Sequence, residues 1–168
     1  MPARYQGGAA VAIADREVGC GGVASSVDIS SVKEGMPLLV GALLALAAGS
    51  LARASRLDRD RAFYPTVAIV ISSYYSLFAV MGGSTRALAL ESLVGVAFSA
   101  AAVFSFLSSL WVVVFALGAH GVFDLVHGTL ISNPGVPGWW PPFCFAYDVT
   151  AAGYLAWLLK RGRIRTAI

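Results

Sequence analysis

The chain has 168 residues, of which 58% are hydrophobic and 12% are charged, and its formal net charge at neutral pH is +3. Soluble globular domains carry about 25% charged residues, so the composition excludes an ordinary soluble domain and favours an integral membrane protein. The basic residues form short clusters beside apolar runs, which indicates membrane topology and not a nucleic-acid-binding surface. The length allows one helical bundle without a second folded domain.

Residues 1–35 are rich in Gly, Ser and Ala and show no sustained hydrophobic period, so they predict a disordered tail. They are a poor signal peptide, because Asp15, Arg16 and Glu17 interrupt their apolar patch. An alternative is that translation begins at Met36, where a hydrophobic segment starts at once. The predicted organisation is therefore a tail over 1–35, which need not belong to the native chain, and a transmembrane domain over 36–168.

Long apolar runs predict an all-α bundle of five transmembrane helices. The expected spans are residues 36–52, 63–81, 87–106, 110–131 and 143–159. Gly82, Gly83 and Ser84 predict a tight turn between the second and third spans. The sequence NPGVPGWWPP predicts a loop before the fifth span, with Trp139 and Trp140 placed as interfacial anchors.

The positions of the basic residues predict the orientation of the bundle. Four basic residues follow the first span and four follow the fifth; they are Arg53, Arg56, Arg59, Arg61, Lys160, Arg161, Arg163 and Arg165. An odd number of spans puts both clusters on one side, and the positive-inside rule makes that side the cytoplasm. We expect a multi-pass protein of the bacterial inner membrane with its N-terminus outside, whose arginine loop also contacts anionic lipid headgroups.

Five ionisable residues interrupt the apolar spans, and ionisable groups inside a membrane are costly and usually functional. They are Glu91, His120, Asp124, His127 and Asp148. In the predicted topology all five lie about 6–16 Å from the outer face, at 1.5 Å of helix rise per residue. Tyr74 and Tyr75 fall at a similar depth. The sequence thus predicts a shared polar layer in the outer half of the membrane.

Spacing predicts that this layer faces inward. His120, Asp124 and His127 stand at i, i+4 and i+7, which places them on one helical face. Cys144 and Asp148 share a face of the fifth span. The only other cysteine, Cys20, lies in the tail, and without a C-x-x-C spacing we infer neither a disulfide framework nor a thiolate metal site.

One interpretation of the layer is a divalent metal site. His120, Asp124 and His127, with Glu91 or Asp148, offer the imidazole and carboxylate ligands that Zn²⁺, Fe or Mn accept. The two histidines are about 10 Å apart along the helix axis. A pair of His120 with Asp124, or of Asp124 with His127, is therefore more plausible than both histidines on one ion.

A second interpretation is acid–base chemistry without a metal, for which Asp124 and His127 are the main candidates. Tyr74, Tyr75, Tyr147 and Trp140 are the candidates for contact with a substrate, although the first two also fit bundle packing and Trp140 fits interfacial anchoring. Proton transport is a weaker alternative, because the inner half of the spans offers no matching polar residues.

Together these patterns predict a small membrane protein with a His/carboxylate pocket, acting as a lipid-modifying hydrolase or isomerase or as a lipid-binding protein. The alternative is a non-enzymatic component whose buried polar network serves helix packing or assembly with a partner. Expected partners are membrane lipids and a second copy of the chain, without nucleic acid.

Overall fold

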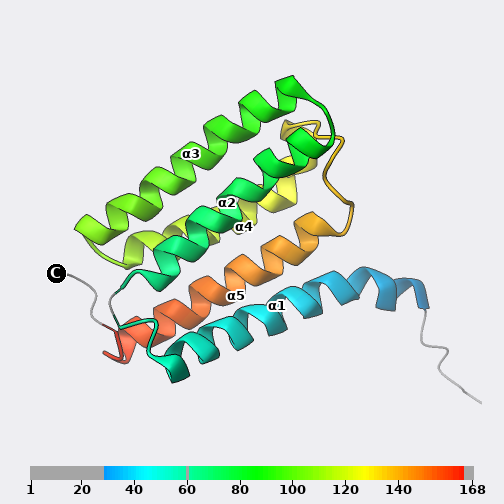
Figure 1. Cartoon of the computed structure of the whole chain (residues 1–168). Helices are drawn as coiled ribbons and strands as arrows, with labels where there is room; N and C mark the ends of the chain where they lie inside the picture. The colour runs from blue at the N-terminus through cyan, green and yellow to red at the C-terminus, as the bar shows by residue number, and fades with distance from the viewer. Residues whose placement is uncertain (1–28, 60, 165–168) are drawn as a thin grey trace, which may run out of the picture.

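A computed structural model of the protein describes residues 29–59 and 61–164, with the side chains of the first helix described from Gly35 onward. The described residues are all-helical (Figure 1). The helices are α1 (Ile29–Ser55), α2 (Phe63–Met81), α3 (Thr85–Leu107), α4 (Trp111–Leu130) and α5 (Trp140–Lys160). Most of the predicted tail lies outside the described residues, but α1 already begins at Ile29, so residues 29–35 are helical.

Local chemistry explains where the helices begin and end. The predicted turn is present: Gly83 adopts a φ of 65°, and the Ser84 side chain caps α3 by accepting a hydrogen bond from the Ala87 N–H at 3.2 Å. The predicted loop through residue 142 is too long, because α5 starts at Trp140. Its first turn accommodates Pro141 and Pro142, since a helix leaves its first N–H groups unbonded in any case.

Four of the five helices are long and apolar enough to cross a membrane: Gly35–Ser55 of α1, and α2, α3 and α4. Large apolar side chains such as Leu43, Leu93 and Phe115 are exposed on the outside of the bundle, as lipid contact requires. These are the features of a multi-pass membrane protein. α5 is less apolar, in part because it carries Asp148 and two prolines, so the fifth span stays a prediction.

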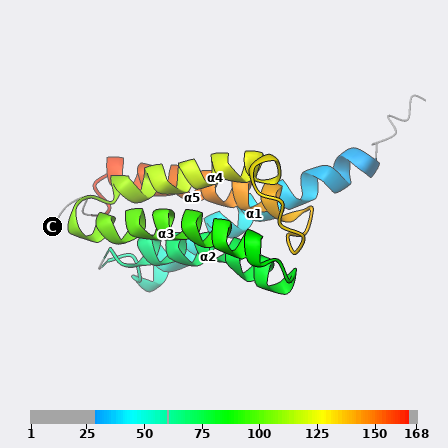
Figure 2. The same cartoon turned by 90° about the horizontal axis from the view of Figure 1, so that it is seen from above.

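The helices form a bundle in which chain neighbours are not always spatial neighbours. α1 packs mainly on α5, α5 also packs on α4, and α3 packs on both α4 and α2, while α2 also touches α4 (Figures 1 and 2). The apolar core includes Leu110, Leu117, Leu155 and Leu158, all almost fully buried. Because α1 packs mainly on α5 and not on α2, a cavity remains between α1 and α2.

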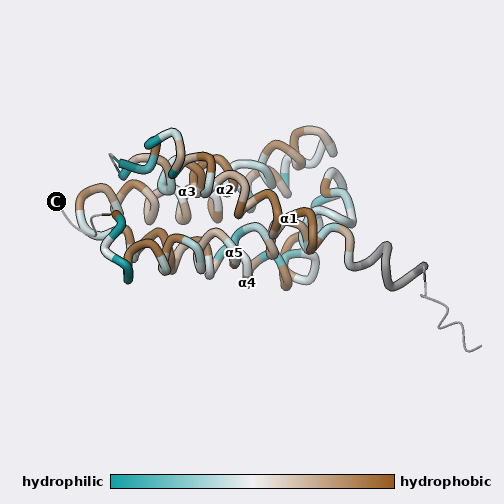
Figure 3. The backbone as a smooth tube through the Cα atoms, turned by 90° about the horizontal axis from the view of Figure 1, so that it is seen from below, coloured by the Kyte–Doolittle hydropathy of each residue, from teal (hydrophilic) through white to brown (hydrophobic). Residues whose placement is uncertain are grey.

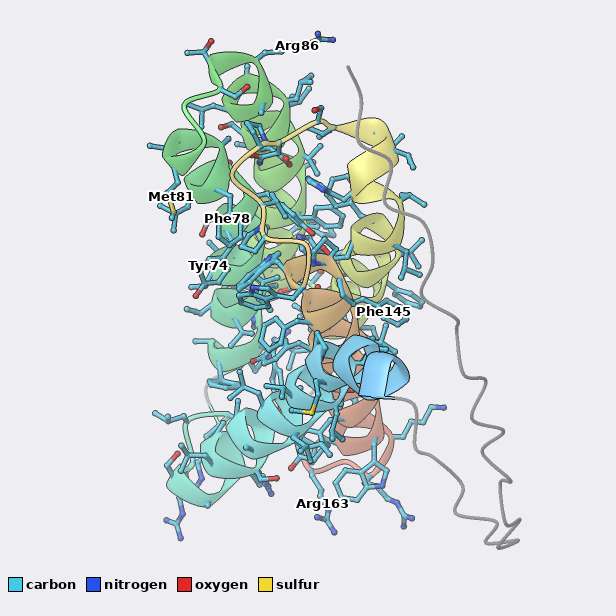
Figure 4. All side chains as sticks on the ribbon, turned by 90° about the vertical axis from the view of Figure 1, so that its right-hand side faces the viewer. Tyr74, Phe78, Met81, Arg86, Phe145 and Arg163 are labelled. Atoms are coloured by element: carbon cyan, nitrogen blue, oxygen red, sulfur yellow. The ribbon has the colours of Figure 1, made fainter. Side chains whose placement is uncertain are left out.

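The two ends of the bundle differ in polarity. The connection between α1 and α2 lies at the same end of the bundle as the last turn of α5, and hydrophilic residues concentrate there (Figures 1 and 3). We call this the basic end. The turn between α2 and α3 and the loop between α4 and α5 form the opposite end, the loop end. Arg163 and Arg86 mark the two ends in Figure 4. Which end faces the cytoplasm stays a prediction.

Candidate functional site

The five ionisable residues predicted to share a layer all point into the bundle. Glu91, His120, Asp124, His127 and Asp148 are each at most 4% exposed. They come from α3, α4 and α5, and Tyr75 of α2 joins them, also buried. The expectation that separate helices bring their polar side chains together on facing surfaces is confirmed. The layer divides into two groups with different partners.

The first group, which we call the polar cluster, consists of His120, Asp124, Cys144 and Asp148. Each offers one nitrogen, sulfur or oxygen atom, and these four atoms all lie within 4.8 Å of one another. His120 Nδ1 lies 2.7 Å from Asp148 Oδ2 and 3.6 Å from Asp124 Oδ2. Cys144 Sγ lies 3.9 Å from Asp148 Oδ2. An i, i+4 pair on α4 thus faces an i, i+4 pair on α5.

Two aromatic side chains hold the polar cluster in place. The Tyr75 hydroxyl donates a 2.7 Å hydrogen bond to Asp124 Oδ1, so the other oxygen of this carboxylate is the one directed toward His120. The ring of Phe98 on α3 meets the His120 ring edge to face, with centroids 4.9 Å apart. The orientation of the α4 residues is therefore fixed from α2 and α3 as well as from α5.

The second group, the His127 network, consists of Glu91, His127 and Asn133. Glu91 Oε1 lies 2.7 Å from His127 Nε2 and accepts a 3.0 Å hydrogen bond from the Asn133 amide. The same amide lies 3.0 Å from the Tyr75 carbonyl oxygen. Gly135 packs so tightly that a Cβ there would clash with the Phe78 carbonyl oxygen. This network ties the loop between α4 and α5 to α2, α3 and α4.

The groups differ from the sequence-based proposals in two respects. Glu91 and His127 pair with each other and are not among the four residues of the polar cluster, whereas His120 and Asp124 do approach each other. Cys144 belongs to the cluster, although its sequence context predicted no thiolate metal site. Its spacing from Asp148 carried the signal, but the missing C-x-x-C pattern led away from it. Nothing in the sequence pattern indicated Asn133, because its contacts depend on how the loop folds back.

Several oxygen atoms of the layer are buried without a hydrogen-bond partner, namely Asp124 Oδ2, Asp148 Oδ1 and Glu91 Oε2. Lys and Arg are absent from the middle of these four helices. Helices α2 and α4 contain no Lys or Arg, and the basic residues of α3 and α5 are Arg86 and Lys160, at the ends of those helices. Burying a carboxylate charge without compensation is costly. Compensation for the cluster must therefore come from a proton or from a bound cation.

A cavity of about 570 Å³ adjoins the polar cluster between α1, α2 and α5. Its walls are largely aromatic and aliphatic, and they include Tyr74, Trp140 and Tyr147. Three of the four predicted substrate contacts therefore line one cavity, whereas Tyr75 lies in the polar layer. Cys144 also lines the cavity, so it connects this apolar space to the cluster.

No family model, curated protein or solved structure matches the chain. The chemistry proposed for the site therefore rests on its residues and their geometry.

Proposed function

We propose that the protein is a membrane-embedded enzyme that binds an apolar, lipid-like molecule in the cavity and acts on it with the polar cluster, as an isomerase or a hydrolase. The observation that carries the proposal is the position of Cys144. This residue lines the cavity, and its sulfur lies 3.9 Å from Asp148. A molecule in the cavity is thus beside buried acid–base groups.

The cavity suits an apolar ligand that comes from the membrane. Its volume falls within the range of about 300–1,000 Å³ that is usual for small-molecule sites. Leu44 and Val70 line it and are themselves exposed on the apolar outside of the bundle. This arrangement favours entry sideways from the lipid, between α1 and α2. Tyr74 and Tyr147 line the cavity, and tyrosine is one of the residue types whose polar group such sites use to orient a ligand.

The His120–Asp148 pair is the proposed acid–base unit. Its 2.7 Å contact allows one proton to be held between Nδ1 and Oδ2, while Oδ1 of Asp148 has no partner and is able to accept another. In an isomerase the pair removes a proton from one carbon and returns one to another carbon. In a hydrolase it accepts the proton of the attacking water and returns it to the leaving group as the bond to that group breaks. Exclusion of bulk water strengthens these electrostatic interactions.

Isotope transfer from water tests the proposal without knowledge of the substrate. The full chain is reconstituted with lipid extract from its expression host in D₂O or in H₂¹⁸O, and the lipids are analysed by mass spectrometry. An isomerase introduces deuterium at carbon and a hydrolase introduces ¹⁸O. Val70→Trp fills the cavity and should suppress the label, whereas Leu77→Trp is the control. Leu77 is a similarly exposed α2 residue that is not among the cavity-lining residues. Equal labelling by both variants would contradict the proposal.

The non-enzymatic alternative is favoured by the connections that the layer makes between helices. Hydrogen-bonded pairs join α2 to α4 through Tyr75 and Asp124, α3 to α4 through Glu91 and His127, and α4 to α5 through His120 and Asp148. In this case the layer sets helix register and supports assembly with a second copy or another membrane protein. No variant would then change isotope transfer, because no label would be transferred.

A further inference from the structure

We propose that the polar cluster is a zinc site in which His120, Asp124, Cys144 and Asp148 are the ligands. The inference goes beyond the proposed function: it concerns the same cluster, but a bound zinc ion takes the place of the proton that His120 and Asp148 share, and its test reads the metal directly without turnover. It also differs from the metal site predicted from the sequence, since it leaves out His127 and includes Cys144.

The geometry of the cluster approaches that of a tetrahedral ion site, because its four ligand atoms lie within 4.8 Å of one another. Ligand atoms about 2.0–2.3 Å from zinc in a tetrahedron lie about 3.3–3.8 Å from one another. The structure has His120 Nδ1 at 3.6 Å from Asp124 Oδ2 and Cys144 Sγ at 3.9 Å from Asp148 Oδ2. The His120–Asp148 contact, at 2.7 Å, is shorter and is a hydrogen bond. An ion that enters between these two side chains replaces that proton. The two ligand atoms must then move from 2.7 Å to about 3.3 Å apart, the separation set by zinc–ligand bond lengths.

The unpartnered atoms of the cluster give a second, independent indication. Asp124 Oδ2 is buried without a hydrogen-bond partner, and it is the oxygen of Asp124 that lies toward His120. Its other oxygen is occupied by the Tyr75 hydroxyl, which has the role of an outer partner that orients a metal-binding carboxylate. The Asp124 and Asp148 carboxylates lie close together, and each has an oxygen without a hydrogen-bond donor. Their combined negative charge is one that a divalent cation neutralises.

The combination of donor atoms selects the metal. Mg²⁺ and Ca²⁺ prefer oxygen ligands throughout, so the Cys144 sulfur argues against both. Zinc accepts imidazole nitrogen, thiolate sulfur and carboxylate oxygen together, usually with four ligands in a tetrahedron. On binding, the Cys144 thiol and the bridging position between His120 and Asp148 release their protons to water, and no bond to carbon forms or breaks.

Cobalt substitution tests the site on the full-length protein. The detergent-purified chain is stripped with a chelator and titrated with Co²⁺, which occupies zinc sites and absorbs light in the near ultraviolet when bound to thiolate. We expect one cobalt per chain, the thiolate absorption band, and displacement of cobalt by Zn²⁺. Cys144→Ser should remove the thiolate band while visible cobalt absorption from the remaining ligands persists. Glu91→Gln is the control: it changes a carboxylate of the same layer to an amide and should leave the spectrum unchanged.

Two results would overturn the zinc site: no cobalt or zinc bound to the wild-type chain, or cobalt bound with a spectrum that Cys144→Ser does not change. The outcome is separate from that of the proposed function. Cobalt binding without isotope transfer would support the metal site and contradict the enzyme, whereas isotope transfer by a wild-type chain that takes up neither added cobalt nor added zinc would contradict the metal site alone.

Discussion

Two His–carboxylate pairs of equal length lie in the same layer of this bundle, and their surroundings differ. His127 with Glu91 and His120 with Asp148 are each 2.7 Å apart and buried. Around the first pair, an asparagine of the loop adds a further donor to the same oxygen. Around the second pair, another carboxylate and a thiol converge, and an apolar cavity begins. A short His–carboxylate contact is therefore not in itself evidence of catalysis.

The two pairs differ in how many other polar side chains lie near them and in whether a cavity reaches them. Incomplete hydrogen bonding does not distinguish them, because each contains a buried oxygen without a partner. Glu91 Oε2 lacks a hydrogen-bond partner, as Asp148 Oδ1 does. Among the residues that the structure describes, only the second pair belongs to a group of metal-binding atoms within 4.8 Å of one another, and its neighbour Cys144 lies on a cavity wall. We infer that the His127 network holds helices and loop together, while the polar cluster carries the chemistry. Variants that affect one group and spare the other test this division.

The largest effect is expected from Asp148→Asn in the cobalt titration. The change removes the carboxylate that contacts both His120 and Cys144. Loss of only an outer partner of a metal ligand weakens binding by about 10–100-fold, so loss of a ligand should exceed about 100-fold. Isothermal titration or absorption at increasing Co²⁺ concentration measures the change. Undiminished affinity in this variant would remove Asp148 from the site.

The next effect concerns stability and should appear only in the His127 network. Glu91→Ala removes the partner of the His127 ring nitrogen and one of the two acceptors of the Asn133 amide, which keeps the Tyr75 carbonyl oxygen. Each buried donor left unpaired costs about 1–3 kcal/mol. We expect a lower thermal unfolding temperature in detergent, followed by intrinsic fluorescence, with cobalt binding retained by the folded protein. Glu91→Gln, which keeps an acceptor oxygen, should restore most of the stability. Loss of cobalt binding in the folded Gln variant would show that the two groups are not separate.

The smallest of these effects is expected from Tyr75→Phe. The variant removes only the hydroxyl that donates to Asp124 Oδ1 and keeps the ring that stacks on His127 at 3.9 Å between centroids. Weaker orientation of Asp124 should lower cobalt affinity by about tenfold, at the lower end of the usual range for such partners. Tyr74→Phe is the matched control. Tyr74 lines the cavity, and its ring centroid lies 5.0 Å from that of Trp140. Equal affinities of the two variants would argue against this support for Asp124.

The sequence was sufficient for the order of the helices and for the gathering of the polar residues in one buried layer. The residue range of α2 agrees with its apolar run, and the helical period placed His120 and Asp124 on one face. It was not sufficient for the pairing, because the rotation and spacing of helices depend on packing between segments far apart in the chain. The cavity likewise arises because α1 packs on α5, which no local pattern of α1 or α2 encodes.

The boundaries that differ have simpler causes. The α5 helix begins at Trp140 because prolines are compatible with a first helical turn, although they also predict loops. Asn133 was missed for a tertiary reason: its amide meets Glu91 and the Tyr75 carbonyl oxygen only after the loop has folded back on α2. Cys144 was missed because a cluster assembled from two helices needs no local cysteine motif.

The most direct measurement of the central claim is the rate of isotope transfer from water into lipid for Asp148→Asn and Glu91→Gln, side by side with the wild type. Both variants exchange one buried carboxylate for an amide at the same layer of the bundle. If the polar cluster acts on a molecule in the cavity, Asp148→Asn should lower the rate by about 10²–10⁴-fold, the usual contribution of a positioned acid or base. Glu91→Gln should leave it close to wild type. A rate that both substitutions lower equally, or that neither lowers, would contradict the account.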